Sequence, residues 1–171
     1  QFYPEKHNRN SRLSVSDCLK KDQEILVQVE KDERGNKGAA LTTNISLAGR
    51  YLVLMPNNPK AAGISRRLEG IERDKLKERI ASLNVPESMG LIVRTAGEGK
   101  DLEDLKWDLE YLQRVWEGIS EANTLKNSPI LIFKESDIII RALRDYLKED
   151  IEEIWVDTEE AFEEASEFVE R

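Results

Sequence analysis

The stretch GLIVRTAGEGK (residues 90–100) places a three-residue apolar run between glycines. Such a run is typical of a buried strand. It continues directly into Arg94 and Thr95. Either the strand reaches the surface there and water solvates the guanidinium, or the strand end binds an anion, because arginine presents a rigid fork of donors that matches phosphate oxygens. The second interpretation requires Arg94 to open into a cleft, unpaired with any carboxylate of the protein.

The same stretch is not a phosphate-binding P-loop. That loop requires the pattern G-x-x-x-x-G-K-[ST], which supplies a backbone cradle and a magnesium-binding hydroxyl. Arg94 stands five residues before Gly99, where the first glycine is needed. Asp101 follows the lysine, where the hydroxyl is needed. Nucleotide binding of the P-loop type is therefore excluded.

The length of 171 residues suits one large domain or two small ones with a hydrophobic core. No apolar run approaches the roughly 20 residues that cross a bilayer and no secretory signal is present, so we expect a soluble protein without a transmembrane segment. Cys18 is the single cysteine and His7 the single histidine, which excludes an internal disulfide and argues against a structural zinc site. The chain starts at Gln1 rather than at methionine, so we expect it to be part of a longer protein.

Acidic residues concentrate at the C-terminal end of the chain. Residues 145–171 contain 12 acidic and 2 basic residues, a net of −10, so the preceding 144 residues carry +2 of the overall −8. Residues 31–67 hold seven bases and two acids, a local net of +5. Because salt screens charge interactions beyond roughly 8 Å, this basic region can bind phosphates even on an acidic protein. The acidic region is predicted to form solvated helix faces.

The N-terminal part of the chain is predicted to be rich in strands. Apolar residues alternate with polar ones from Ile25 onward, which predicts a half-buried strand over residues 23–31. A second strand is predicted over residues 39–48, so that the two form a hairpin with a basic turn. A third is predicted over residues 50–56, where Pro56 ends it.

Beyond residue 70, helices and strands are predicted to alternate. Apolar residues recur at helical spacing, most clearly in the stripe from Leu102 to Ile119. The predicted helices span residues 71–83, 101–125, 136–147 and 158–170, and the predicted strands span 90–95, 130–134 and 153–157. The expected N-caps are Asp101, Ser136 and Thr158. We expect the three tryptophans, Trp107, Trp116 and Trp155, in the core or at a contact between protomers.

This order of elements, strands first and alternation afterwards, predicts a mixed α+β fold. The first part has the pattern of an OB-like β piece, and the second that of an α/β piece. We place the boundary between them near Thr43.

Several motifs of this chain are familiar as a set. Residues 33–70 contain GNKGAALTT, YLVLMPNNP and GISRR, and GLIVRTAGEGK and IIIRALRDYL follow in the same order. The set closely resembles the N-terminal catalytic half of bacterial ribonuclease E/G endoribonucleases, over essentially all 171 residues. The segments MPNNP and GISRR favour the E-type enzyme over the shorter G-type.

The resemblance implies three pieces and a binding site. Residues 1–43 would be the later strands of an OB-fold RNA-binding domain, residues 44–139 a sensor of the 5′-monophosphate end of RNA, and residues 140–171 the beginning of a ribonuclease-H-like subdomain. Arg94 and Thr95 would contact the terminal phosphate, Gly49 would offer its backbone N–H, and Val53 would pack against the terminal base. The expected contacts along the RNA path are Lys31, Lys37, Arg66 and Arg67.

Some of these residues have plainer interpretations. Lys37 could protect an edge hairpin from aggregation. Arg66 and Arg67 could pair with Glu69 and Glu72 at the start of a helix instead of clamping phosphate. Four aspartates, Asp137, Asp145, Asp150 and Asp157, could suggest metal ligands, but helix capping and solvation explain them more simply.

The resemblance also implies what these 171 residues lack. Family catalysis uses magnesium bound by two aspartates and an asparagine in a later DNase-I-like domain, and a two-cysteine zinc link joins protomers. We therefore expect no catalytic residue, metal ligand or cofactor in this chain, which should bind RNA weakly and cleave nothing. The implied partner is single-stranded RNA with a 5′-monophosphate, not DNA. The parent would be a homotetramer in a degradosome-type assembly, acting in mRNA decay and rRNA processing in the cytoplasm or at the inner-membrane periphery.

Two other functions remain open at this point. The acidic C-terminal helices and the leucine-striped helix could form a protein-interaction or oligomerisation module. A small phosphatase using Arg94 as a phosphate clamp is the third hypothesis, although no nucleophile and base are paired in the sequence.

Overall fold

The computed structural model describes residues 14, 18–65, 67, 69–124, 128–134, 138–147 and 151–169. The chain divides into two compact units, Gln1–Thr43 and Asn44–Arg171. The sequence predictions for His7, Arg66, Ser136, Asp137 and Asp150 lie outside the described residues.

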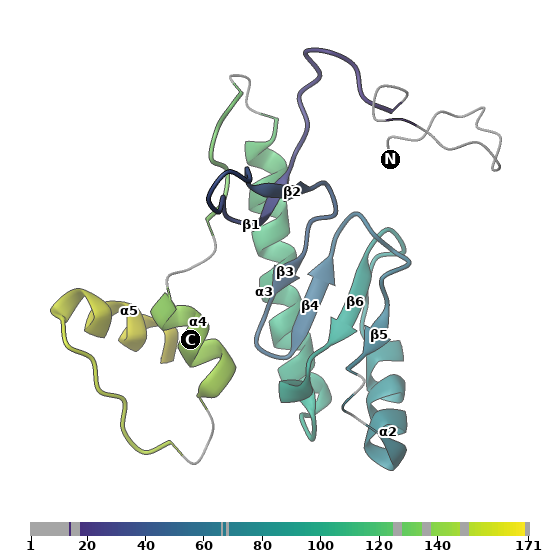
Figure 1. Cartoon of the computed structure of the whole chain (residues 1–171). Coiled ribbons are helices and arrows are strands. Elements are labelled where there is room, and N and C mark those ends of the chain that lie inside the picture. Colours follow the sequence, from purple (N-terminus) through teal and green to yellow (C-terminus); the bar gives the residue numbers. More distant parts are fainter. Residues whose placement is uncertain are drawn as a thin grey trace. The chain divides into compact units, whose positions relative to one another are not determined.

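In the first unit, a β-hairpin is the main element (Figure 1). Strands β1 (Gln28–Lys31) and β2 (Ala40–Thr42) pair antiparallel, with Val29 opposite Leu41 and a register shift between Val29 and Lys31. The predicted hairpin is confirmed, although its first strand is shorter than expected. Within the described residues this unit has two strands and no closed barrel.

A four-stranded sheet forms the centre of the second unit. It runs in the order β3 (Leu47–Ala48), β4 (Leu52–Met55), β6 (Gly90–Val93) and β5 (Gly63–Ile64). Strand β4 pairs antiparallel with both β3 and β6, and β5 pairs parallel with β6. Leu52, Leu54 and Val93 are fully buried, so the predicted buried strand before Arg94 is confirmed.

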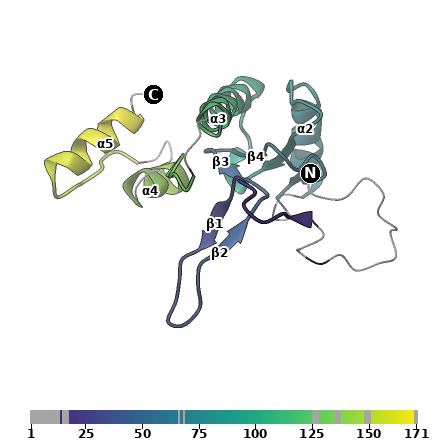
Figure 2. The ribbon, with the colours of Figure 1, turned by 90° about the horizontal axis from the view of Figure 1, so that it is seen from above.

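Helix α3 (Leu102–Ala122) packs against β3 and β4 (Figures 1 and 2). Its buried residues are Leu105, Leu109, Leu112 and Ile119, which belong to the predicted stripe, whereas Leu102 at the start of that stripe is 38% exposed. Asp101 caps it, with the Asp104 N–H donating to the Asp101 carboxylate at 2.9 Å. Helix α2 (Gly70–Ala81) contacts β5, and α4 (Ile138–Tyr146) packs against α5 (Glu159–Val169). No helix in the described part of the chain is long and apolar enough to span a bilayer.

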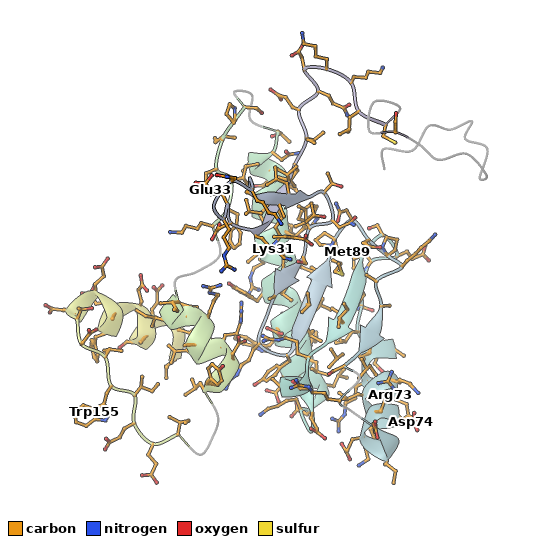
Figure 3. The ribbon with its side chains drawn as sticks, in the orientation of Figure 1. Lys31, Glu33, Arg73, Asp74, Met89 and Trp155 are labelled. Atoms are coloured by element: carbon orange, nitrogen blue, oxygen red, sulfur yellow. The ribbon has the colours of Figure 1, made fainter. Side chains whose placement is uncertain are left out.

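Three strand predictions differ from the structure. The strand predicted over residues 39–48 is two strands, β2 and β3, because Ile45 between them donates its N–H to the Asn57 side chain at 3.0 Å instead of to a neighbouring strand. Residues 130–134 and 153–157 are not strands, since no strand of the described chain lies beside them to form a ladder. Most of their apolar side chains are exposed, and Trp155 is 87% exposed and projects from the chain between α4 and α5 (Figure 3).

Candidate functional site

The turn between β3 and β4 meets the end of β6, and Arg94 lies at their junction. The Arg94 N–H donates to the Tyr51 carbonyl at 2.8 Å, which continues the pairing of β4 with β6. The Arg94 side chain returns to the same turn, where Nη1 donates to the carbonyl oxygens of Gly49 at 2.6 Å and Arg50 at 3.5 Å. The backbone of the turn therefore fixes one side of the guanidinium.

Asp108 of α3 holds this turn from the other side. Its Oδ1 accepts the N–H of Arg50 at 2.9 Å, and its Oδ2 accepts the N–H groups of Tyr51 and Leu52 at 2.8 Å each. Burial raises the pKa of Asp108 above its ordinary value, while the three N–H donors and the charge of Arg94 act in the opposite direction. One carboxylate thus satisfies three consecutive backbone donors and ties the turn to the helix.

Gly49 is required by this arrangement. A Cβ at position 49 would overlap both carboxylate oxygens of Asp108. The Gly49 N–H donates to the Leu52 carbonyl at 2.8 Å. The atoms that approach Gly49 closely belong to Asp108, and the N–H that the family resemblance assigns to a phosphate is bonded within the hairpin.

Helix α4 brings further charged groups to the turn. Arg144 Nη1 donates to the Ala48 carbonyl at 3.2 Å, and Arg50 Nη2 donates to the Leu147 carbonyl just beyond the helix at 2.9 Å. Together with Arg94, three arginines therefore gather around residues 48–51. Arg94 and Arg144 donate to carbonyl oxygens of that segment, so the backbone of the turn helps to fix the positions of both side chains.

Asp145 of α4 pairs with this cluster. Its Oδ1 accepts hydrogen bonds from Arg94 Nη2 and, at 3.3 Å, from Arg144 Nε. Partial burial acts to raise the pKa of Asp145, but hydrogen bonds and charge from Arg94 and then from Arg144 outweigh it and hold the pKa below the ordinary value. The expectation of an Arg94 unpaired with protein carboxylates is therefore wrong in this structure. A phosphate could bind Arg94 Nη2 only by displacing Asp145.

The sequence comparisons now identify the family. A sequence model of the ribonuclease E/G family matches residues 46–171. This chain belongs to the ribonuclease E/G family. Ribonuclease E of Haemophilus influenzae is 55% identical over 169 residues, which make up 99% of this chain and 18% of that protein.

Two further relatives agree. Ribonuclease E of Escherichia coli (strain K12) is 55% identical over 163 residues, 95% of this chain and 15% of that protein. Ribonuclease G of Haemophilus influenzae is 37% identical over 155 residues, 91% of this chain and 31% of that protein. The chain thus spans less than a third of the length of these ribonucleases.

The other residues implied by the ribonuclease E/G resemblance lie in different places. Thr95 is exposed directly beside Arg94, at the start of a single 3-10 turn, Thr95–Gly97. Val53 is half-buried on β4 between the buried Leu52 and Leu54, so it faces the opposite side of the sheet from them. Arg67 is exposed in the second unit. Lys31 and Lys37 are exposed on the hairpin of the first unit.

The alternative assignments are partly answered. Glu72 pairs with Lys75 at 2.8 Å. Asp145 neither caps a helix nor joins a metal cluster, and no group of three or more His, Cys, Asp or Glu side chains in the described part of this ribonuclease E/G chain is placed to hold a metal ion. Asp145 instead forms ion pairs with Arg94 and Arg144.

Two residues of this candidate site, Asp108 and Arg144, are not singled out by the sequence. Asp108 had a detectable signal, because it lies between Leu105, Leu109 and Leu112 on the apolar stripe of α3. A carboxylate on a buried helix face needs hydrogen-bond donors. Arg144 had no comparable signal, since α4 carries charges on a partly exposed surface.

We predict that Asp108→Ala destabilises the chain by about 3 kcal/mol, because three backbone donors lose a charged acceptor. Chemical unfolding measures the change. Glu110→Ala, which removes an exposed carboxylate two residues away on the same helix, is the matched control and should cost less than about 0.5 kcal/mol. Equal losses in the two variants would show that Asp108 does not hold the turn.

Gly49→Ala should cost about 2 kcal/mol, because the added methyl group collides with the Asp108 carboxylate. The control is Gly118→Ala in α3, where no atom lies within 4 Å of the new Cβ. That change should instead stabilise the chain by about 0.5–1 kcal/mol through helix propensity. Thermal unfolding of both variants is the measurement, and shifts of the same sign would contradict the prediction.

The Arg94–Asp145 ion pair should contribute to stability in a pH-dependent way. Since the pKa of Asp145 is lowered in the folded chain, its contribution is present above the unfolded pKa of about 3.9 and is lost as pH falls through the lower folded value. The side chains are 24% and 36% exposed, so we expect only about 0.5 kcal/mol. Urea unfolding of the wild type and Asp145→Asn should differ at pH 7 and converge towards pH 3; a constant difference would contradict this assignment.

Proposed function

We propose that this chain is the part of a single-strand-specific endoribonuclease that binds the 5′-monophosphate end of RNA. The observation that carries the proposal is Arg94, whose Nη1 is anchored on the turn; because its Nη2 is paired with Asp145, a phosphate has to displace that carboxylate. A guanidinium held in this way can form charge-assisted bonds to phosphate oxygens. Family membership supports the reaction class, because its curated relatives are ribonucleases E and G.

In this proposal the phosphate takes the place of the Asp145 carboxylate at Arg94 Nη2. The exposed Thr95 adds a hydroxyl, and Val53 offers an apolar surface for the terminal base. Gly49 contributes through its carbonyl, which orients Arg94, rather than through its N–H, which is bonded to Leu52. Such a site distinguishes chain ends rather than base sequences, which suits a single-stranded substrate.

We also propose the domain roles that the family resemblance implies. Residues 1–43 would belong to an OB-fold, residues 44–139 to the sensor, and residues 140–171 to a ribonuclease-H-like subdomain. The basic residues expected along the RNA path are Lys31, Lys37, Arg66 and Arg67. Capture of the 5′ end would raise the local concentration of downstream RNA at a catalytic domain by about 10²–10⁴-fold.

Cleavage itself would take place outside these 171 residues. We propose that the parent protein is a cytoplasmic homotetramer in a degradosome-type assembly, that magnesium assists its hydrolysis of phosphodiesters, and that zinc links its protomers. The roles of mRNA decay and rRNA processing follow from the same proposal. The support is the family, together with the small share of each relative that this chain spans.

A protein-interaction module is the second candidate. Large apolar side chains are exposed on the helices and on the chain between α4 and α5: Trp107 (66%), Trp155 (87%) and Phe162 (59%). Contact with another part of the parent, or with another protomer, would cover them. This function does not require Arg94, so one substitution separates the two candidates.

Arg94→Ala should abolish the preference for a 5′-monophosphorylated RNA oligonucleotide over its 5′-hydroxyl twin, a loss of about tenfold from a charge-assisted bond. Fluorescence anisotropy at low and physiological salt measures both affinities. Arg114→Ala, on the exposed face of α3, removes the same charge and should keep the preference. Equal binding of the two RNAs by the wild type would overturn the proposed function.

A further inference from the structure

A preformed anion position lies between two guanidiniums of the second unit. Arg94 Nη2 and Arg144 Nε both donate to the same oxygen, Oδ1 of Asp145. Each arginine also donates a hydrogen bond to a backbone carbonyl oxygen, Arg94 to that of Gly49 at 2.6 Å and Arg144 to that of Ala48 at 3.2 Å. The two guanidiniums are therefore anchored independently of the carboxylate that joins them.

We propose that Asp145 is an internal competitor for this position, and that a terminal RNA phosphate binds between Arg94 and Arg144 by displacing it. Arg144 is then a second phosphate ligand, and Asp145 determines how tightly an anion must bind the two arginines in order to displace it. This inference rests on the proposed function. It adds Arg144 as a second arginine that binds the phosphate, and Asp145 as the carboxylate that the phosphate must displace.

The exposure of the ion pair makes displacement feasible. The side chain of Asp145 is 36% exposed and that of Arg94 is 24% exposed, and exposed ion pairs contribute little to stability. Asp108 behaves differently, because it is held by three backbone N–H groups beneath the turn. Of the two carboxylates beside Arg94, only Asp145 can therefore rotate into solvent without leaving buried donors unsatisfied.

Charge determines which ligands succeed. A phosphodiester within an RNA strand carries one negative charge, as the Asp145 carboxylate does, so exchanging one for the other neutralises no additional positive charge. A terminal monophosphate carries about 1.5–2 negative charges at pH 7. It therefore interacts more strongly with two guanidiniums than the carboxylate does. The Asp145 carboxylate therefore competes effectively with internal phosphodiesters and is displaced by the terminal monophosphate.

Three RNAs of one sequence test the proposal: one with a 5′-monophosphate, one whose 5′-phosphate carries a methyl ester and hence a single charge, and one with a 5′-hydroxyl. The wild type should bind the monophosphate best and bind the methyl ester no better than the hydroxyl. Asp145→Asn should bind the monophosphate about fivefold tighter, since its competitor is weakened. It should also bind the methyl ester a few-fold better than the hydroxyl, because a single charge now suffices.

Two further variants complete the experiment. Glu117→Gln, on the exposed surface of α3, makes the same charge change and should leave all three affinities unaltered. Arg144→Gln in the Asp145→Asn background should reverse the gain for the monophosphate, because one of the two guanidiniums is gone. Circular dichroism and thermal unfolding establish that each variant is folded, and Asp145→Ser serves in place of Asp145→Asn if the latter is not.

Each outcome has a distinct meaning. If Asp145→Asn leaves the affinities within twofold of the wild type while Arg94→Ala loses the end preference, the competitor role is wrong and the proposed function stands. If Asp145→Asn weakens binding of the monophosphate, Asp145 orients Arg94 rather than competing with phosphate, which also overturns the inference. If the wild type does not distinguish the monophosphate from the hydroxyl, the proposed function fails and the inference fails with it.

Discussion

The carboxylate of Asp108 accepts three consecutive backbone N–H groups, and the rest of the site depends on this contact. A tight turn between strands exposes backbone donors that water or a side chain must satisfy. Here a side chain of the helix that covers the sheet satisfies them, so the position of α3 and the shape of the turn are set together. The carbonyl oxygens of Gly49 and Arg50 then face the side chain of Arg94, which they fix at the end of β6.

The electrostatic design follows from that geometry. Three guanidiniums converge on a four-residue segment, and two carboxylates offset part of their charge. The two carboxylates differ in kind: Asp108 is half-buried and bonded to backbone, whereas Asp145 is more exposed and bonded to side chains. Arg94 and Arg144 are thus bonded both to backbone carbonyls of the turn and to the Asp145 carboxylate.

Sequence reasoning recovered the elements whose pattern is local. Periodic or position-specific signals in the sequence predict four features: the apolar stripe of α3, its cap at Asp101, the buried strand before Arg94 and the hairpin of the first unit. The predicted strands at residues 130–134 and 153–157 failed because β structure depends on a partner strand, which a local pattern does not reveal. Trp155 illustrates the same point, since its expected burial needs a neighbour that the described chain does not provide.

The candidate site was predictable only in part. The sequence draws attention to Arg94, but its partner Asp145 lies 51 residues away and has no distinguishing pattern. Asp108 could have been found, since a carboxylate on the apolar stripe of a helix requires donors. Long-range polar contacts of this kind are set by tertiary packing, and a single sequence carries little information about them.

The closeness of Gly49 and Asp108 links two distant positions in the chain. A β-carbon at position 49 would overlap a carboxylate oxygen of Asp108, so a side chain there forces that carboxylate to shift. Substitutions in the turn and at position 108 are therefore coupled, and an engineered transfer of the turn to another scaffold would have to carry its helix along.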